Sequence, residues 1–482
     1  MAFTYDDAAH LIRRMAFGGS QSDINNLVER GRDRAVDYLV NYNQINDADF
    51  DNLMDESFDL SDPRDGEKFN LGEITRWWTT LMMLGPRQFE EKMTLFWHNH
   101  FATANSKVED VLMYIQNRTL RKHALDKFDT LLVKVAKDPA MLVWLDGVTN
   151  VADAPNENFA RELMELFTMG INDPVTGQRN YTERDVQEVA RAFTGWNYSA
   201  PDEEESNPFA YKFEFNEDQH DFRPKTVFGQ TANYEGEDII EIIAARRETA
   251  RFLVKKFFEF FVYPLTDSAA DRATIDKFAD VYIRRDHSIK ELARAIFSSD
   301  EFFSQRARFA LIKQPLELVI GAARLLEARF TPGTYDNHEP AHILWYAAAE
   351  LGQNIFNPPD VSGWNLNLGW LNTAVMLNRF NYAAFLAASR PEHDDREEPG
   401  LYLTLSRLKK LTKKDAKKTA KKFLSVMGPL NVDAATRDSL IAYLETDSDG
   451  NRVEFRRTDE VIDRKVRGLV HLIMCLAEFQ VN

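Results

Sequence analysis

The clearest pattern of apolar and polar positions runs through residues 156–170, NENFARELMELFTMG. At about 100° per residue, the apolar side chains fill one arc of a helix and the polar side chains fill the other. Asn156 is suited to cap the first turn, and Gly170 is suited to the left-handed position after the last turn. The pattern therefore predicts a helix over residues 156–169. Its polar face carries Glu157, Asn158, Arg161, Glu162 and Glu165.

Apolar residues at helical spacing recur along most of the chain, as in residues 182–196, TERDVQEVARAFTGW. Residues 211–216, YKFEFN, instead alternate like a strand, and we expect them to pair with residues 225–229, KTVFG. The sequence thus predicts a mainly α fold, with one small β-hairpin insertion near 211–229. We expect a main helical domain over residues 1–390 and a C-terminal helical tail over residues 391–482 that packs back on it. Residues 391–400, PEHDDREEPG, are typical of a linker.

Composition narrows the choice of function. The chain has 482 residues, 44% of them hydrophobic, which is enough for a large core. Its formal net charge of -17 disfavours a general nucleic-acid binder, because neutralising phosphates needs a basic surface. The single cysteine, Cys475, rules out a disulfide within the chain and a cysteine-based zinc site.

Long apolar runs do not occur in the sequence. We therefore expect no membrane span and no secretory signal, and by default a cytoplasmic location. The basic run RLKKLTKKDAKKTAKKF, residues 407–423, is most simply a solvated helix face, with binding to an anionic surface as the alternative.

The glutamates of residues 156–169 are the strongest candidates for chemistry. Clustered carboxylates have separated pKa values, so that one can serve as an acid while another stays ionised. Glu162 lies at the edge of the polar arc beside Leu166, and we expect it to be the most desolvated. Such a set suits cleavage of a glycosidic bond or binding of a divalent metal. The alternative is a solvated face with an Arg161–Glu165 or Glu157–Arg161 pair four residues apart.

Two histidines in FWHNHF, His98 and His100, could join the glutamates in a mixed metal site or act as acid and base. Their side chains point apart in a helix and would converge only in a turn. The structural alternative is that one packs against Trp97 and the other caps a helix.

Other candidates are assigned to substrate binding. They are Asn156, the pair His220–Asp221, in which the carboxylate could orient the imidazole, and the loop tryptophans Trp364 and Trp370, whose flat faces could stack on a sugar. The alternative for both tryptophans is core packing beneath a long loop.

Several blocks in order resemble a known family. They include AHLIRRMAFGG at 9–19, FWHNHFAT at 96–103, PNENFARELMELFTMGI at 155–171 and FNPPDVSGW at 356–364. Together they resemble the bacterial family of proteins of unknown function numbered 1800, over nearly the whole chain. The resemblance implies no settled activity, and it implies export, since members often look exported.

Three classes of function remain open from the sequence. The first is an enzyme that acts on a carbohydrate or surface polymer through the glutamates. The second is a metal-dependent enzyme that uses His98 and His100 as well. The third is a non-catalytic scaffold or assembly protein with a protein partner, in which these polar residues form buried networks that specify the core.

Overall fold

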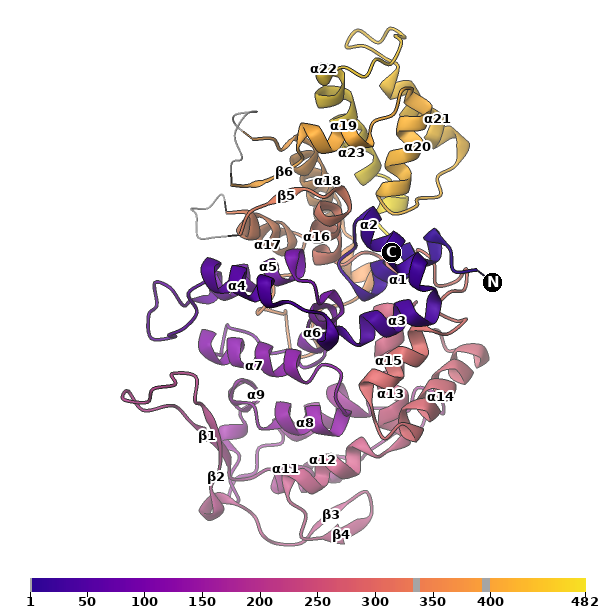
Figure 1. Cartoon of the computed structure of the whole chain (residues 1–482). Coiled ribbons are helices and arrows are strands. Elements are labelled where there is room, and N and C mark those ends of the chain that lie inside the picture. Colours follow the sequence, from indigo (N-terminus) through magenta and orange to yellow (C-terminus); the bar gives the residue numbers. More distant parts are fainter. Residues whose placement is uncertain (1, 333–338, 392–398) are drawn as a thin grey trace.

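The protein is mainly α-helical in the computed structural model, which describes residues 2–332, 339–391 and 399–482 (Figure 1). The predicted fold class is therefore confirmed. Most of the expected linker, residues 392–398, lies outside the described residues. In Figure 1 the C-terminal helices α19–α23 form one end of the molecule, and strands β1–β4 lie at the opposite end.

The first third of the chain is helical, and its helices contribute to the core. In order, these are α1 (Tyr5–Met15), α2 (Gln21–Arg30), α3 (Arg32–Val40), η1 (Tyr42–Gln44), α4 (Ala48–Ser57), α5 (Leu71–Leu84), α6 (Gln88–His100), α7 (Asp110–Lys122), α8 (Phe128–Ala136), α9 (Pro139–Trp144) and η2 (Gly147–Thr149).

The middle of the chain holds the segment of clustered glutamates and most of the strands. In order, the elements are α10 (Asn158–Glu162), η3 (Leu163–Thr168), α11 (Glu183–Ala192), β1 (Trp196–Ser199), β2 (Lys212–Phe215), η4 (Glu217–Gln219), β3 (Lys225–Val227), β4 (Gln230–Ala232), α12 (Gly236–Ala244), α13 (Arg247–Phe261), α14 (Ala269–Arg284) and α15 (Ile289–Phe297).

The last third returns to the core and then forms the upper end of Figure 1. Its elements are α16 (Pro315–Leu326), β5 (Arg329–Phe330), α17 (Pro340–Glu350), η5 (Asn367–Trp370), α18 (Thr373–Ala388), β6 (Leu401–Tyr402), α19 (Leu405–Leu411), α20 (Ala416–Val426), α21 (Ala434–Leu444), α22 (Asp459–Val461), η6 (Ile462–Val466), α23 (Arg467–Met474) and η7 (Ala477–Phe479).

The predicted pairing of residues 211–216 with 225–229 is wrong. Strand β2 pairs with β1, placing Phe215 opposite Trp196, and β3 pairs with β4. Phe228 and Gly229 have φ values of 50° and 78°, so the chain reverses directly after β3 in a tight turn. The segment KTVFG is thus half strand and half turn, and its partner is the strand that follows it.

The predicted helix over 156–169 is also different in detail. Gly170 has φ +73° and ends the segment as predicted. At the other end the N-cap is Glu157 rather than Asn156, and the Asn156 carboxamide oxygen accepts the Asn158 amide at 2.9 Å just before the first turn. Between these ends, α10 changes at Leu163 into the π-helix η3, in which the Met169 amide donates to the Met164 carbonyl at 3.2 Å. The Thr168 hydroxyl donates a hydrogen bond to the Leu163 carbonyl at 2.5 Å. This buried side-chain contact competes with regular helical bonding and accompanies the wider turn.

A buried polar network joins segments that are distant in sequence. The Glu317 carboxylate of α16 forms an ion pair with Lys92 of α6, and it accepts the Asn482 side-chain amide at 2.8 Å. The Arg14 guanidinium of α1 donates to the main-chain oxygens of Ala307, at 2.8 Å, and of Asn482, at 2.9 Å. These contacts hold α1, α6, α16 and the last residues of the chain together, so residues of the tail contact the main helical part.

Gly170 is the residue whose replacement should test the end of this segment. We expect Gly170→Val to lower the free energy of unfolding by about 1 kcal/mol or more, because a β-branched residue is strained at positive φ. A Cβ atom here would also lie 2.9 Å from the ring of Phe252. Denaturant unfolding measures the change. Gly177→Ala, also at positive φ but with open space around it, is the control for backbone strain alone. A Gly170→Val variant as stable as wild type would contradict this end.

Candidate functional site

The polar face of α10 is joined to the start of α11. Arg161 forms an ion pair with Glu157 at 3.0 Å and a two-pronged ion pair with Glu183, whose second oxygen lies 3.0 Å from the guanidinium. Glu183 is the first residue of α11, after the capping residue Thr182. Two of the polar residues predicted for this face, Glu157 and Arg161, therefore lie together, and the Arg161 guanidinium is shared between the carboxylates of Glu157 and Glu183.

Glu162 differs from its neighbours. Its side chain is partly buried, and no hydrogen-bond donor or cation among the described residues lies within bonding distance of its carboxylate. Burial raises the pKa of Glu162, the nearby charge of Glu165 raises it further, and Arg161 lowers it. The expectation that Glu162 is the desolvated carboxylate of this helix agrees with this geometry.

Glu165 has a neutral partner. Its carboxylate accepts the hydroxyl of Tyr181 at 3.0 Å, and burial together with this bond raises the pKa of Tyr181. Further along the same segment, the Asn158 amide donates to Asp146 at 3.4 Å, and Lys107 forms an ion pair with Asp146 at 2.7 Å. Hydroxyl, amide, ammonium and carboxylate groups are therefore present along this segment.

His98 and His100 do not join the glutamates, and their assignment to the catalytic group is corrected. Helix α6 runs through His100, so the two rings point to different parts of the core. The His98 Nε2 accepts the Phe356 amide at 3.0 Å, and the His100 Nε2 donates to the Phe167 carbonyl at 2.9 Å. Burial lowers the pKa of each to about 3. Both histidines therefore link α6 to other segments.

Metal-ligating side chains do not converge in the part of the chain that the structure describes. There, no three His, Cys, Asp or Glu side chains gather closely enough to hold a metal ion.

Trp364 and Trp370 are buried, with about 5% and 4% of their surfaces exposed, so their assignment as stacking faces for a ligand is corrected. The Trp364 amide donates to the Asn99 side chain at 2.6 Å, and its ring lies 5.6 Å from that of His98. Packing of the loop on α6, rather than exposure, explains these aromatic residues.

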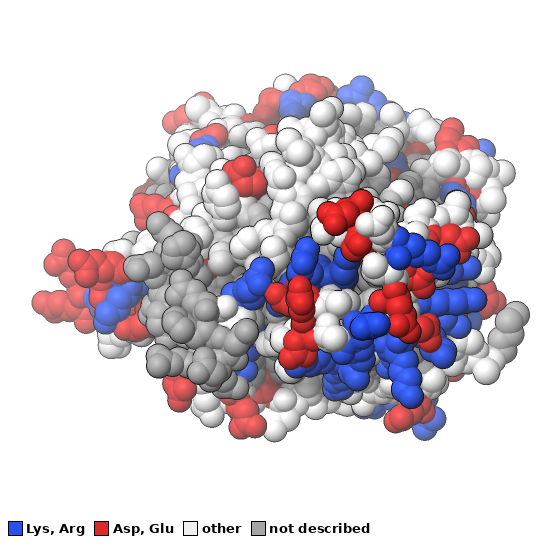
Figure 2. Space-filling view, turned by 90° about the horizontal axis from the view of Figure 1, so that it is seen from above, with Lys and Arg blue, Asp and Glu red and all other residues white. Residues whose placement is uncertain are grey.

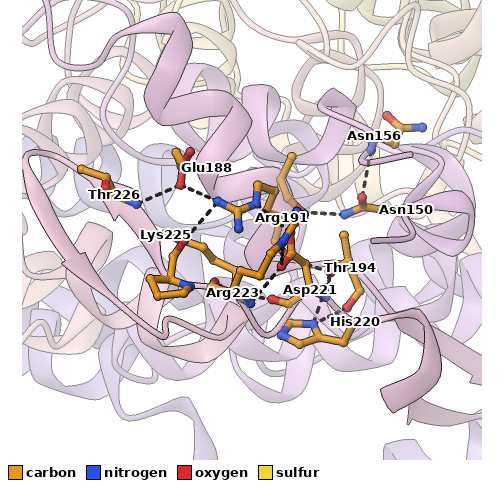
Figure 3. Close-up of polar contacts among 12 residues, drawn as sticks. Asn150, Asn156, Glu188, Arg191, Thr194, His220, Asp221, Arg223, Lys225 and Thr226 are labelled. Carbon is orange, nitrogen blue, oxygen red and sulfur yellow. Dashed lines mark hydrogen bonds and ion pairs between the residues drawn. The ribbon is translucent and has the colours of Figure 1, made fainter. Parts of the chain in front are cut away.

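The expected His220–Asp221 pair does not form. The Asp221 carboxylate accepts from Arg191 at 2.7 Å and from Arg223 at 2.6 Å, whereas the His220 Nδ1 donates to the Thr194 carbonyl at 2.7 Å (Figure 3). His220 is in extended conformation, in which neighbouring side chains point to opposite sides. The two guanidinium groups hold the pKa of Asp221 well below its usual range. Asp221 therefore orients arginines rather than a histidine.

Sequence reasoning missed the partners of this network. Glu188 links Arg191, at 2.8 Å, to the Thr226 amide, at 2.8 Å. Asn150 accepts the Asn156 amide at 2.8 Å and donates to the Ala190 carbonyl at 2.9 Å. The spacing of Glu188 and Arg191 on one helix could have predicted their ion pair. Nothing in the sequence indicated their long-range partners, Asp221 and the Thr226 amide. Asn156 is therefore placed by Asn150 at the entry to α10 (Figure 3).

Asp221 offers a test of this network. We expect Asp221→Asn to lower the free energy of unfolding at pH 7 by about 2 kcal/mol, because Arg191 and Arg223 lose their shared anion. A carboxylate with a depressed pKa stabilises the fold above about pH 4, its unfolded value, and this contribution is lost as the pH falls below that. The difference between wild type and variant should therefore shrink on acidification below pH 4. Denaturant unfolding at several pH values checks this, and a difference independent of pH would contradict the assignment.

His98 should make stability depend on pH in a different range. Because its pKa is about 3 in the fold and about 6.5 when unfolded, its neutral form stabilises the fold above pH 6.5, and this contribution falls as the pH decreases toward 3. We expect His98→Gln to remove roughly 1 kcal/mol of the stability that wild type loses between pH 6.5 and 5.5. Urea unfolding at these two pH values measures it. Equal losses in both proteins would show that His98 is not held neutral.

Of the comparisons with known proteins, the one with family models finds a match. The family model described as "Protein of unknown function (DUF1800)" matches residues 10–481. No curated protein and no solved structure matches the chain. Because the family model covers nearly the whole sequence, the chain belongs to the DUF1800 family of proteins of unknown function.

Proposed function

We propose that this protein is an enzyme that acts on a carbohydrate or related surface polymer, with Glu162 as its proton donor. One observation carries the proposal: Glu162 is a partly buried carboxylate with a raised pKa and without a bonding partner among the described residues. A general acid must hold its proton near the working pH, and burial shifts the pKa of Glu162 in that direction.

A second carboxylate lies on the same segment. Glu165 is three residues further on, and its charge already acts on Glu162. The Tyr181 hydroxyl at 3.0 Å fixes its orientation. In this arrangement Glu162 would protonate the leaving oxygen of a glycosidic bond, and Glu165 would act as base or nucleophile on the sugar ring.

The surrounding groups suit a polyhydroxyl substrate. Asn158, Asp146 and Lys107 provide donors and acceptors one turn before Glu162. Asp146 has φ +58°, a conformation that non-glycine residues adopt infrequently and that turns its backbone sharply at this point. Hydroxyl groups of a sugar would replace water on these side chains.

A non-catalytic scaffold is the second candidate, and a specific observation favours it. The contacts of Arg161 with Glu183 and of Glu165 with Tyr181 tie α10 and η3 to the segment that begins α11. Such contacts specify how elements are placed whether or not a substrate binds. A metal-dependent enzyme is supported less, since His98 and His100 are engaged elsewhere in the core.

Glu162→Gln separates the two candidates. We expect this nearly isosteric change to lower hydrolysis by about 100-fold or more, because the general acid is lost, and to leave the melting temperature unchanged. The measurement is release of reducing ends from a panel of bacterial surface polysaccharides. The matched control is Glu157→Gln on the same helix, which removes a carboxylate that is paired with Arg161 and should retain activity. A Glu162→Gln protein with lowered stability, in a chain that cleaves no member of the panel, would favour the scaffold.

A further inference from the structure

A row of lysines crosses one end of this acidic protein. Residues 405–426 contain nine lysine and arginine residues and one aspartate, although the whole chain has a net charge of -17. We call the exposed lysines of residues 413–421 the lysine stripe: Lys413, Lys414, Lys417, Lys418 and Lys421. Figure 2, which looks at this end of the molecule, shows lysine and arginine side chains gathered on one side of the surface, with some aspartate and glutamate side chains among them.

The stripe is electrostatically unfavourable in the protein alone. Lys417 and Lys421 lie one helical turn apart, where like charges repel. Lys417 and Lys418 also occupy the first turn of α20, where the helix dipole favours acidic residues instead. Lys418 pairs with Asp415 at 3.0 Å, but the other four members have no ion pair with a carboxylate in the described ranges.

The neighbouring cations increase the local positive potential. Lys422 is partly buried, and burial, Lys413 and Arg407 together lower its pKa. Its ammonium donates to the neutral side chain of Gln21 at 2.5 Å. These cations repel one another, and an anionic partner would relieve that repulsion.

The shape of the stripe indicates a broad partner rather than a small one. Every exposed residue of α20 is a lysine, and the opposite side of the helix is fixed in the core by Phe423 and Leu424. Lysines on a convex helix point apart, whereas a small anion needs donors that converge. A hollow beside Lys414 is lined by three carboxylates, of Asp415, Glu445 and Glu454, against the two cations Lys414 and Arg452, and this excess of negative charge disfavours an anion.

We propose that the lysine stripe docks this protein on the surface of a bilayer that contains anionic lipids. Lysines act as mobile point charges and suit fluid headgroups, and polybasic segments bind such surfaces through charge alone. The stripe lies at one end of the molecule, so docking leaves the acidic remainder pointing away from the plane (Figures 1 and 2). A nucleic acid long enough to follow the protein beyond the stripe would meet that acidic remainder.

Sedimentation of the full chain with vesicles tests the proposal. We expect binding to vesicles of equimolar phosphatidylcholine and phosphatidylglycerol, no binding to pure phosphatidylcholine, and loss of binding as salt is raised. Each lysine near an anionic surface strengthens association about fivefold, so replacing Lys413, Lys417 and Lys421 together by Gln should lower the partition coefficient about 100-fold. The matched control replaces three exposed lysines of other elements by Gln: Lys122, Lys134 and Lys212.

Three outcomes would overturn the proposal. The first is equal binding to neutral and anionic vesicles, and the second is a stripe variant that binds like wild type while its circular dichroism shows a native fold. The third is tighter binding to duplex DNA than to anionic vesicles at the same salt, which would assign the stripe to nucleic acid. If the triple variant fails to fold, Lys417→Gln alone, with an expected fivefold loss, provides the same comparison.

Discussion

The buried carboxylate of Glu317 is the constraint on which much of this structure depends. An ion in the protein interior is tolerated only when its charge and its hydrogen-bonding atoms are satisfied, because the cost of removing it from water is several kcal/mol. Lys92, the Gln314 amide and the Asn482 side chain provide those partners, from α6, from the turn before α16 and from the last residue. Removing one partner would leave a buried charge, so these segments must assemble in one arrangement.

Helix α6 carries this constraint to the face of the molecule that holds the glutamates. Lys92 fixes one part of the helix on Glu317, and one helical turn and more away His98 and His100 bond to the backbones of Phe356 and Phe167. Phe167 belongs to η3, which also contains Glu165 and directly follows Glu162. His100 therefore positions the segment of the proposed site, and His98 positions the backbone at Phe356. Both are structural roles that a search for metal ligands in the sequence reads as chemistry.

Local patterns were predictable from the sequence and long-range partners were not. The end at Gly170 and the partial burial of Glu162 follow from backbone preference and spacing, and the structure agrees with them, whereas the N-cap lies one residue after the predicted Asn156. The partner of Asp221 does not follow, because Arg191 lies 30 positions away and only the folded chain brings it close. The strand partner predicted for KTVFG was wrong for another reason: Phe228 adopts a positive φ that its residue type does not favour.

The junction between α10 and η3 explains why Glu162, and not a neighbouring carboxylate, is left unpaired. Glu162 is the last residue of the α-helix, and the wider π turn begins at Leu163. In the α-helical part, Arg161 reaches Glu157 one turn back and Glu183 across to α11, so its donors are taken. In the π part, Glu165 is directed to Tyr181. Glu162 lies between these two sets of contacts, where burial and the charge of Glu165 raise its pKa and the charge of Arg161 lowers it only in part. Turns of π-helix frequently mark functional sites.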